Sequence, residues 1–598
     1  MTKMIDDEDY IIKRTRPYVE LTEELEKVIK KLKPVKYRKR QPYEKQSTKQ
    51  KTKFMKQLNH VFVEEAQNLC NAADLKIADV EMQEIYTNEE NQNIIDVFLE
   101  KQKENHVQKC VYWKDKKLVS DKTYQSAISF AEYDLAPLNQ VRDEKKKLNA
   151  ELEVFENRLG VYVSVREKVQ KILEKVISKC KIKRNKIHIK FAGDGTNTAR
   201  HQSLLAMSFS ILNEGKKART ASGTYIVGLF DICESYEEIE EEMKNLTDIE
   251  INGQKYFIEQ YLGGDLKFLA LVTGIMQANS NFPCVSCKYE TGTTCKNNVH
   301  ENNKEFEWSM IDPKWARTTQ EASEVASNET KKIQFCQKNR PIFAHIPIKR
   351  IVFDLLHLFL RICDKLKDLL YSNLILADEK EKNIRDEQIR KNKQREKDLK
   401  NNLSVGDFQK PITLTNYQVK FALFLTQECK ISKPTYFNKE KKKVLVRDLR
   451  GGEYKKVMEK FNLTILFPNL EKAKLIDEIW NGFYTIIKLL KDDEKKYEST
   501  KLKTDTKSWL INYLDVYDTS DVTPYIHTFV YHLHELQLLY GNVNEFNMEG
   551  LEKKNGILKS QYFGATNRHK KSYLVQLINQ QNRLDLLSQL GDGYVINN

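Results

Sequence analysis

Two acidic residues stand beside glycine at points where strands are predicted to end. Residues 186–192 alternate apolar and polar side chains, which predicts a half-buried strand ending in a turn at Gly193-Asp194-Gly195. Residues 249–261 predict a hairpin with an Asn-Gly turn, and its return strand leads to Asp265. A lone aspartate between glycines is most often a feature of an ordinary turn. Two such carboxylates at strand ends could instead form part of a metal site.

A third acidic feature lies near the end of the chain. Glu549 and Glu552 are three residues apart, so they share a face if this stretch is helical, and Asn555 follows one turn later. The alternative is an ordinary charged helix. Mg²⁺ prefers near-octahedral oxygen coordination, usually from one or two carboxylates and substrate phosphate oxygens. A glutamate that joined Asp194 and Asp265 would suit such an ion.

Two cysteines and two histidines have the spacing of a zinc site. Cys284 and Cys287 form a Cys-x-x-Cys pair, and four residues separate His527 from His532. Two thiolates and two imidazoles satisfy a closed tetrahedral zinc site. The cysteine pair is also compatible with redox chemistry or simple burial, and the histidines with ordinary core positions. Three nearby residues are rival ligands: Cys295, His300 and His534.

Taken in order, these residues resemble the motifs of one family, the catalytic subunit of the V(D)J recombinase and the related Transib transposases. That family has an Asp-Gly, an Asp nineteen residues before a Cys-x-x-Cys, an Asp-x-Leu-His, a His-x-x-x-x-His and a Glu-Gly-x-Glu-x-x-Asn. The matching residues of this chain are Asp194-Gly195, Asp265 with Cys284, Asp354-Leu355-Leu356-His357, His527 with His532, and Glu549-Gly550 with Glu552 and Asn555. The resemblance covers about residues 150–598 as an ordered series of motifs.

The resemblance implies an α+β fold, with an RNase H-like catalytic core, a large and mostly helical zinc-binding insertion, and a helical N-terminal region. It implies one acid triad as the catalytic ligands of two Mg²⁺ or Mn²⁺ ions: Asp194, Asp265 and Glu552. It implies four ligands of one structural Zn²⁺: Cys284, Cys287, His527 and His532. Three further residues would support the active site: His357, Glu549 and Asn555. The alternative for His357 is that of most histidines on an apolar helix, an ordinary core residue.

The implied activity is that of a DNA transposase or recombinase. The enzyme would nick DNA at the element ends, use the freed 3′-OH to form a hairpin, and transfer the ends into a target. The implied partners are double-stranded DNA, a second copy of the chain and an accessory subunit, and the implied location is the nucleus. Three alternatives remain: an RNase H-like nuclease without transposition, a domesticated DNA-binding protein, and a zinc-stabilised scaffold that binds no nucleic acid. The intact acids favour an enzyme over the last two.

Length and composition agree with a large nucleic-acid-binding protein without requiring one. The 598 residues allow roughly four domains of ~150 residues. The 99 Lys and Arg exceed the 85 Asp and Glu, and a net charge of +14 permits a polyanionic partner. We find no apolar secretion signal and no apolar stretch of ~18 residues, so we expect a reducing compartment, no membrane span and no disulfide framework.

The predicted organisation has six parts. These are a basic arm (1–57), a helical dimerisation and DNA-binding region (58–184), the core with the first two acids (185–278), a Cys-pair segment (279–350), a helical insertion with the His pair (351–550), and the third acid with a helical tail (551–598). Helices are predicted at 61–73, 124–135, 141–158, 160–179, 234–244, 266–274, 413–425 and 475–491. Residues 204–212 and 224–230 are apolar, the latter being typical of a central strand. Residues 378–402 are charge-dense, which indicates either a long solvated helix or a disordered linker.

Two basic runs are candidates for contacts with the DNA backbone, where each contact adds salt-sensitive affinity. The first run contains Lys36, Arg38, Lys39 and Arg40. The second contains Arg568, Lys570 and Lys571. The first is equally compatible with a solvated tail or a nuclear-import signal, and the second with a solvated turn.

Overall fold

The structure is a computed structural model that describes residues 89–128, 135–199, 202–230, 237–293, 307–326, 334–401, 403–404, 406–440, 443–493, 497–567 and 572–588. The chain divides into two compact units, Met1–Gln102 and Lys103–Asn598, and all that follows concerns the second. Several predictions lie outside the described residues. They are the helix at 61–73, the basic residues Lys36, Arg38, Lys39, Arg40, Arg568, Lys570 and Lys571, and the rival ligands Cys295 and His300.

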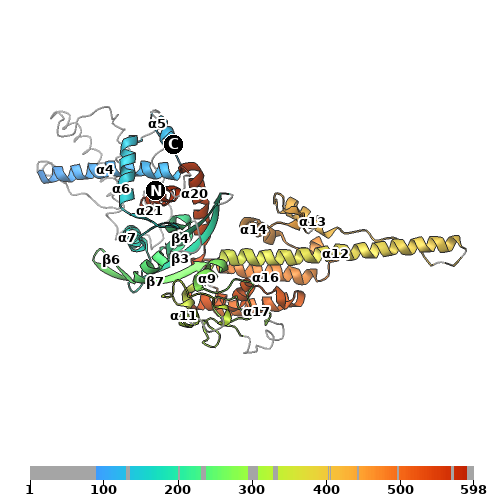
Figure 1. Cartoon of the computed structure of the whole chain (residues 1–598). Coiled ribbons are helices and arrows are strands. Elements are labelled where there is room, and N and C mark those ends of the chain that lie inside the picture. The colour runs from blue at the N-terminus through green and yellow to red at the C-terminus, as the bar shows by residue number, and fades with distance from the viewer. Residues whose placement is uncertain are drawn as a thin grey trace, which may run out of the picture. The chain divides into compact units, whose positions relative to one another are not determined.

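The described residues form a mixed α and β fold that contains an eight-stranded sheet with the order β1-β2-β5-β4-β3-β7-β6, where β8 also pairs with β7 (Figure 1). The strands are β1 (Val154–Glu156), β2 (Gly160–Val163), β3 (Lys186–Ala199), β4 (Gln202–Ile211), β5 (Tyr225–Phe230), β6 (Asp248–Ile251), β7 (Gln254–Gly264) and β8 (Ile351–Phe353). Strands β3, β4 and β5 are antiparallel neighbours, whereas β7 runs parallel to both β3 and β8. All six residues of β5 are buried, as expected for an interior strand.

Strand β3 is where the predicted strand lies, but it does not turn at Asp194. The side chains of Ile187, Ile189 and Phe191 are fully buried, in agreement with the alternating pattern. Antiparallel pairing with β4 continues past Asp194, which lies opposite Ala206, and the strand ends at Ala199. The predicted turn is therefore wrong, because the ladder with β4 takes up the backbone groups of this segment.

The predicted hairpin is confirmed as strands β6 and β7. Asn252 and Gly253 connect them, with φ angles of 52° and 76°, as a two-residue turn with two left-handed residues requires. Strand β7 then pairs with β3 in parallel, with Gly263 opposite Ala192. Helix α9 (Leu266–Thr273) follows and ends at the left-handed Gly274, so the helix predicted at 266–274 is also confirmed.

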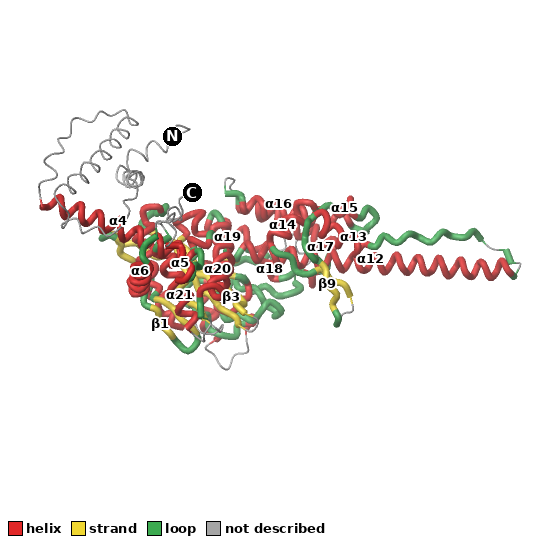
Figure 2. Tube along the Cα trace, turned by 90° about the horizontal axis from the view of Figure 1, so that it is seen from above, coloured by secondary structure: helices red, strands yellow, loops and turns green. Residues whose placement is uncertain are grey.

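Helices cover the sheet and build the long insertion between α9 and the last helices (Figures 1 and 2). Those before the insertion are α4 (Glu89–Lys116), α5 (Asp121–Ile128), α6 (Leu138–Ala150), α7 (Val165–Val176), α8 (Glu237–Asn245) and α9. Those within it are α11 (Thr319–Ala326), α12 (Leu355–Lys400), α13 (Tyr417–Leu423), α14 (Gly451–Lys460), α15 (Leu463–Leu466), α16 (Ala473–Lys491), α17 (Ser499–Val516), α18 (Pro524–Tyr531) and α19 (Leu533–Tyr540). Helices α20 (Glu549–Ala565) and α21 (Ser572–Leu586) follow, and a small hairpin is formed by β9 (Thr435–Asn438) and β10 (Lys443–Val446).

Two predicted helices differ from the structure. Residues 160–163 form strand β2 instead of the start of a helix, because they pair with β5, and helix α7 begins only at Val165. The helix predicted at 141–158 ends at Ala150, and residues 154–156 form β1. The helix predicted at 124–135 begins within α5 (Asp121–Ile128), and its residues 129–134 lie outside the described part of the chain. The charge-dense residues 378–400 are helical, as the outer part of α12.

One continuous hydrophobic core runs from the sheet into the helical insertion. It includes Phe191 and Phe209 from the sheet, and Ile362, Trp480 and Phe529 from the insertion. Among the helices that the structure describes, none combines the length and the apolar character needed to cross a membrane.

Candidate active site and metal centre

Strands β3 and β7 bring Asp194 and Asp265 to the same level of the sheet, where β7 ends and β3 continues. The strands are parallel and in register up to the pair Ala192 and Gly263, and each aspartate lies two residues beyond that pair. Asp265 caps helix α9, since its Oδ1 accepts a hydrogen bond from the backbone N–H of Phe268 at 2.7 Å.

The glycines beside the two aspartates provide room for helix α9. A Cβ atom at either Gly193 or Gly264 would lie 2.4 Å from the ring of Phe268, so neither position could hold a larger residue without displacing that ring. In contrast, a Cβ atom at Gly195 would meet no atom within 4 Å. Two of the glycines that drew attention in the sequence therefore serve close packing beneath the acids.

Helix α20 brings the third acid to this place. Asn555, one turn after Glu552, donates a hydrogen bond from Nδ2 to Asp194 Oδ2 at 2.6 Å. Asn555 is buried, whereas the side chain of Glu552 is 41% exposed and hence accessible to a ligand. The burial of Asp194, followed by the negative charge of Glu552, raises the pKa of Asp194 to about 7; Asp265 adds to this shift and His357 opposes it. The predicted triad and Asn555 thus share one electrostatic environment.

Glu549 has a different role from Glu552. It begins helix α20 and accepts hydrogen bonds from Lys491 Nζ at 3.0 Å and from Asn547 Nδ2 at 3.3 Å. Burial opposes this charge, but the nearby ammonium group of Lys491 lowers the pKa of Glu549. Glu549 thus stands at the start of α20, paired with Lys491, whereas the charge of Glu552 acts on Asp194.

His357 links Glu552 to a fully buried aspartate. Its Nε2 lies 3.3 Å from Glu552 Oε1, and its Nδ1 lies 2.6 Å from Asp354 Oδ2. Burial disfavours the charged ring, but the hydrogen bonds with Asp354 and Glu552 outweigh it and raise the pKa of His357 to about 10. Both ring nitrogens then donate. The predicted supporting residue therefore contacts the third acid directly.

Asp354 joins two elements of the site. It caps helix α12 by accepting from the backbone N–H groups of Leu356 and His357, and it also accepts from Met548 N at 2.8 Å. Met548 directly precedes α20. In this motif the sequence drew attention to His357. The structure shows that Asp354 bonds both to the start of α12 and to the residue before α20.

Lys190 is a second residue whose role the sequence did not reveal. It was placed among the polar residues of a half-buried strand, but its side chain is 3% exposed. Its ammonium group donates to the carbonyls of Phe546 and Asn547 at 3.2 and 3.0 Å, and its stem crosses Gly263, where a Cβ would lie 3.0 Å from Lys190 Cδ. Burial lowers the pKa of Lys190 to about 8. Lys190 thus connects its own strand β3 with the end of β7 and with the segment before α20, and these are the three elements that carry or lead to the acids.

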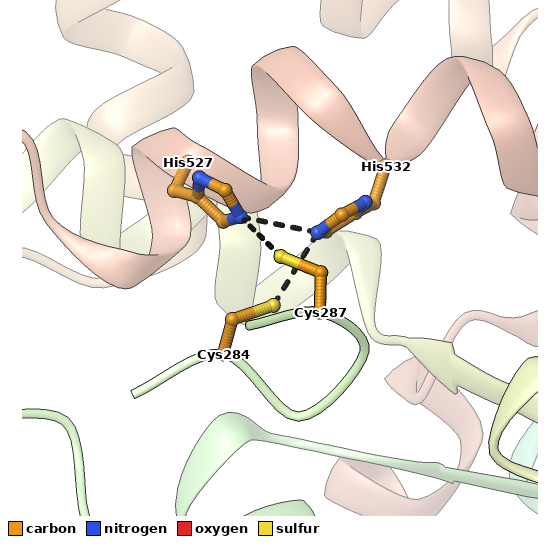
Figure 3. A group of neighbouring side chains, drawn as sticks. All are labelled: Cys284, Cys287, His527 and His532. Atoms are coloured by element: carbon orange, nitrogen blue, oxygen red, sulfur yellow. Dashed lines mark hydrogen bonds between the residues drawn. The ribbon is translucent and has the colours of Figure 1, made fainter. Parts of the chain in front are cut away.

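The predicted zinc ligands converge in the core of the insertion (Figure 3). Cys284 Sγ lies 3.3 Å from His532 Nε2, Cys287 Sγ lies 3.3 Å from His527 Nε2, and the two Nε2 atoms are 3.1 Å apart. All four residues are buried, and their ligand atoms lie within 4.8 Å of one another. This Cys₂His₂ cluster could bind one zinc ion. The rival His534 does not belong to it.

Neighbouring residues hold these four side chains in place. Glu535 lies 3.1 Å from His532 Nδ1 and accepts a hydrogen bond from Met310 N at 2.8 Å. The guanidinium group of Arg317 donates to the carbonyls of Cys284 and Cys287 at 2.8 and 2.9 Å. Such contacts orient metal ligands. Burial lowers the pKa of His527 to about 4, whereas for His532 the neighbouring Cys284 and Glu535 outweigh burial and raise the pKa to about 9. Zinc binding requires both rings to be neutral.

A break between two helices lets histidines five residues apart face the same point. Helix α18 ends at Tyr531, and His532 stands between it and α19 with a φ of −113°. The cysteines come from the loop after α9, and the seven cysteines that the structure describes are all free thiols. The cluster therefore ties the start of the insertion to the segment shortly before α20.

The predicted acid triad does not meet as closely as the Cys₂His₂ cluster: the carboxylate oxygens of Asp194, Asp265 and Glu552 do not all lie within 4.8 Å of one another. Within the described residues, the Cys₂His₂ cluster is the one group of three or more His, Cys, Asp or Glu whose ligand atoms all lie within 4.8 Å of one another. No family model matches this chain, and no curated protein matches it.

Proposed function

We propose that this chain is a DNA transposase or recombinase of the DDE type, related to the V(D)J recombinase and Transib transposases. The observation that carries the proposal is the hydrogen bond from Asn555 to Asp194. It joins the helix of Glu552 to the strand of Asp194, beside the parallel strand that leads to Asp265. Acids from distant parts of the sequence are thereby brought near the end of strand β7.

The order of the strands supports an RNase H-like core. Strands β3, β4 and β5 form an antiparallel series, and β7 then returns parallel to β3. Once the β6 hairpin strand is set aside, β3 and β7 are the first and fourth strands of this series. Adjacent first and fourth strands that each lead to an aspartate are what such a core requires.

The donor atoms of the site fit a hard divalent cation, because they are all carboxylate oxygens. Asp194, Asp265 and Glu552 would hold two Mg²⁺ or Mn²⁺ ions. When bound, such ions activate water or a 3′-OH as nucleophile and stabilise the leaving oxygen.

The residues around the acids position them. Asn555 fixes one oxygen of Asp194, and the cap of helix α9 fixes one oxygen of Asp265. His357, held by Asp354, holds Glu552. Because catalysis of phosphoryl transfer rests on positioning and electrostatics, these contacts are important for the rate.

In this proposal the zinc ion is structural, since two cysteines and two histidines complete a tetrahedral shell. It would fix the insertion so that α20 returns to the sheet. The partners would be double-stranded DNA at element ends and target, a second copy of the chain because paired ends need paired sites, and an accessory subunit. The protein would act in the nucleus.

The test is cleavage of labelled duplex DNA by the purified full-length chain in Mg²⁺, Mn²⁺ or EDTA. We expect cleavage in either metal and none in EDTA, with hairpin products on the flanking DNA when element ends are supplied. Metal-dependent cleavage without end preference or hairpins would identify a nuclease without transposition. DNA binding without cleavage in either metal would identify a DNA-binding protein and contradict the proposal.

Replacing Lys190 with methionine is expected to lower cleavage about 10–100-fold, as for residues that support metal ligands. Methionine keeps the volume of the side chain but leaves the carbonyls of Phe546 and Asn547 without their donor. The start of α20 should then be held less firmly against the acids. The measurement is the cleavage rate as a function of Mn²⁺ concentration, and excess Mn²⁺ should partly restore the variant.

Lys367→Met is the matched control. Lys367 is also buried, but it bonds to Asp448 at 3.0 Å, in the helical insertion. The Lys367→Met variant should be less stable than the wild type, but its cleavage rate should depend on Mn²⁺ concentration as that of the wild type does. Identical Mn²⁺ profiles for the two variants would show that Lys190 contributes only to folding.

A further inference from the structure

Helix α12 begins at the acid cluster and leads far away from it. Asp354 caps its first turn, and the helix continues for 46 residues, or about 69 Å at 1.5 Å per residue (Figure 1). Its buried residues end at Leu374, and Ile375 and Ala377 also pack against the core, so the helix projects beyond the core of the insertion from residue 378 to residue 400. The projecting part is connected directly to the site through one rigid element.

One face of the projecting helix is covered by the chain as it returns along the helix (Figure 2). Asn392 exchanges hydrogen bonds with the backbone of Gln409, and Glu381 accepts from the backbone N–H of Thr415 at 2.6 Å. Asp378 accepts from the backbone N–H of Tyr417 at 2.7 Å. The outer part of α12 and the returning residues 409–417 therefore form one projecting unit, which we call the arm. Acidic and amide side chains of α12 hold the returning residues, which we call the return leg.

A different face of the arm carries a stripe of exposed cations, which we call the basic stripe: Arg390, Lys393, Lys397 and Lys400. Their spacing of three, four and three residues places them on one side of the helix. None of the four lies within 4 Å of an acidic side chain among the described residues. From residue 388 to residue 400 the chain has six Lys or Arg and two Asp or Glu, so this end of the arm is strongly positive.

We propose that the basic stripe binds the phosphate backbone of the same DNA duplex whose cleavage site lies at the acid cluster. The proposal rests on the DNA-cleaving function proposed above. Unpaired, solvated cations along one line complement a chain of phosphates, and each contact releases counterions from the DNA. Asp378 and Glu381 are occupied with the return leg, and Glu387 pairs with Lys391.

The length of the arm fixes which part of the DNA would be contacted. Arg390 and Lys400 lie 33 and 43 residues beyond His357, or about 50 and 65 Å along the helix. At 3.4 Å per base pair these distances correspond to about 15 and 19 base pairs from the cleaved bond. The arm would thus hold DNA well outside the active site and favour sites with a long flank.

The test compares the full-length chain with the variant R390E/K393E/K397E/K400E on a fluorescent 40-base-pair duplex. We expect the variant to bind at least about 10-fold more weakly at 100 mM salt, and the slope of log affinity against log salt to fall by about 2–4. We also expect the wild-type protein to cut at least about 15 base pairs from an end, whereas the variant should lose this preference.

Two further variants control the comparison. K338E/K439E/K474E/K501E changes the net charge equally at exposed lysines elsewhere, and its salt slope should fall by less than about 1. R390Q/K393Q/K397Q/K400Q removes the charges with less repulsion and should give about half the effect, which guards against misfolding of the first variant.

The outcomes separate this inference from the proposed function. If the wild-type chain neither binds nor cuts DNA, the proposed function fails. If it binds and cuts DNA but the slopes and cut positions of both stripe variants equal those of the wild type, only the role of the basic stripe is overturned. That result would assign the stripe to another class of partner, such as an acidic protein surface.

Discussion

Asp194→Ala, Asp265→Ala and Glu552→Ala are each expected to lower metal-dependent DNA cleavage by at least about 10²–10³-fold. Each variant removes carboxylate oxygens that would hold the metal ions, whereas affinity for DNA comes from Lys and Arg contacts with phosphates. DNA binding measured in EDTA should therefore stay close to that of the wild type. Cleavage rates in Mg²⁺ and Mn²⁺ together with binding in EDTA check both parts of this prediction.

Glu549→Ala is the matched control, because Glu549 lies one turn before Glu552 on the same helix and pairs with Lys491. It should retain most of the cleavage activity. Loss of cleavage in Glu549→Ala with normal cleavage in Glu552→Ala would contradict the assignment of the third acid. Equal loss of DNA binding in all the variants would indicate misfolding instead of catalysis.

Asp194→Asn distinguishes a lost catalytic group from a damaged fold. A carboxyl whose pKa is raised in the folded state lowers the stability progressively as the pH rises from its unfolded value near 4 through about 7. Removing that charge should therefore stabilise the metal-free protein at pH 8, by on the order of 1–3 kcal/mol. The melting temperature in EDTA should rise while cleavage is lost.

Local chemistry explains which parts of the fold could be predicted from the sequence. Asn252-Gly253 specifies its hairpin because both residues tolerate positive φ. The alternation of Ile187, Ile189 and Phe191 specifies a strand. Cys284 with Cys287, and His527 with His532, each have a spacing that suits metal ligands. These signals are each contained within a few residues, whereas the joining of the two pairs into one site came from the resemblance to the recombinase family.

The errors arose where distant segments decide the outcome. Gly193 suggested a turn, but its lack of a side chain serves the packing of Phe268, which belongs to a later helix. Lys190 was expected on the polar side of its strand, yet the segment before α20, some 350 residues later, covers it. Residues 160–163 are a short apolar run that a helix or a strand could use equally well. Pairing with β5 decides in favour of a strand.

Cys284→Ser is expected to remove the zinc ion and to destabilise the insertion. The Cys₂His₂ cluster is fully buried, so loss of one thiolate leaves the other three ligands without the ion that would hold them together. Because metal binding at such a site contributes folding energy directly, the loss should exceed about 3 kcal/mol. Metal analysis should give about one zinc per wild-type chain and almost none in the variant, with a lower melting temperature.

Cleavage by Cys284→Ser should fall as a consequence, although the acid cluster itself is unchanged. His532 lies in the segment that leads through α19 to α20, the helix of Glu552. The ion would hold this segment to the loop after α9, and helix α9 itself begins directly after Asp265. Cys363→Ser is the control, because Cys363 is an equally buried free thiol on α12 outside the cluster. It should keep its zinc. Equal zinc contents in the two variants would remove the metal site, and with it one support for the proposed relationship to the V(D)J recombinase and the Transib transposases.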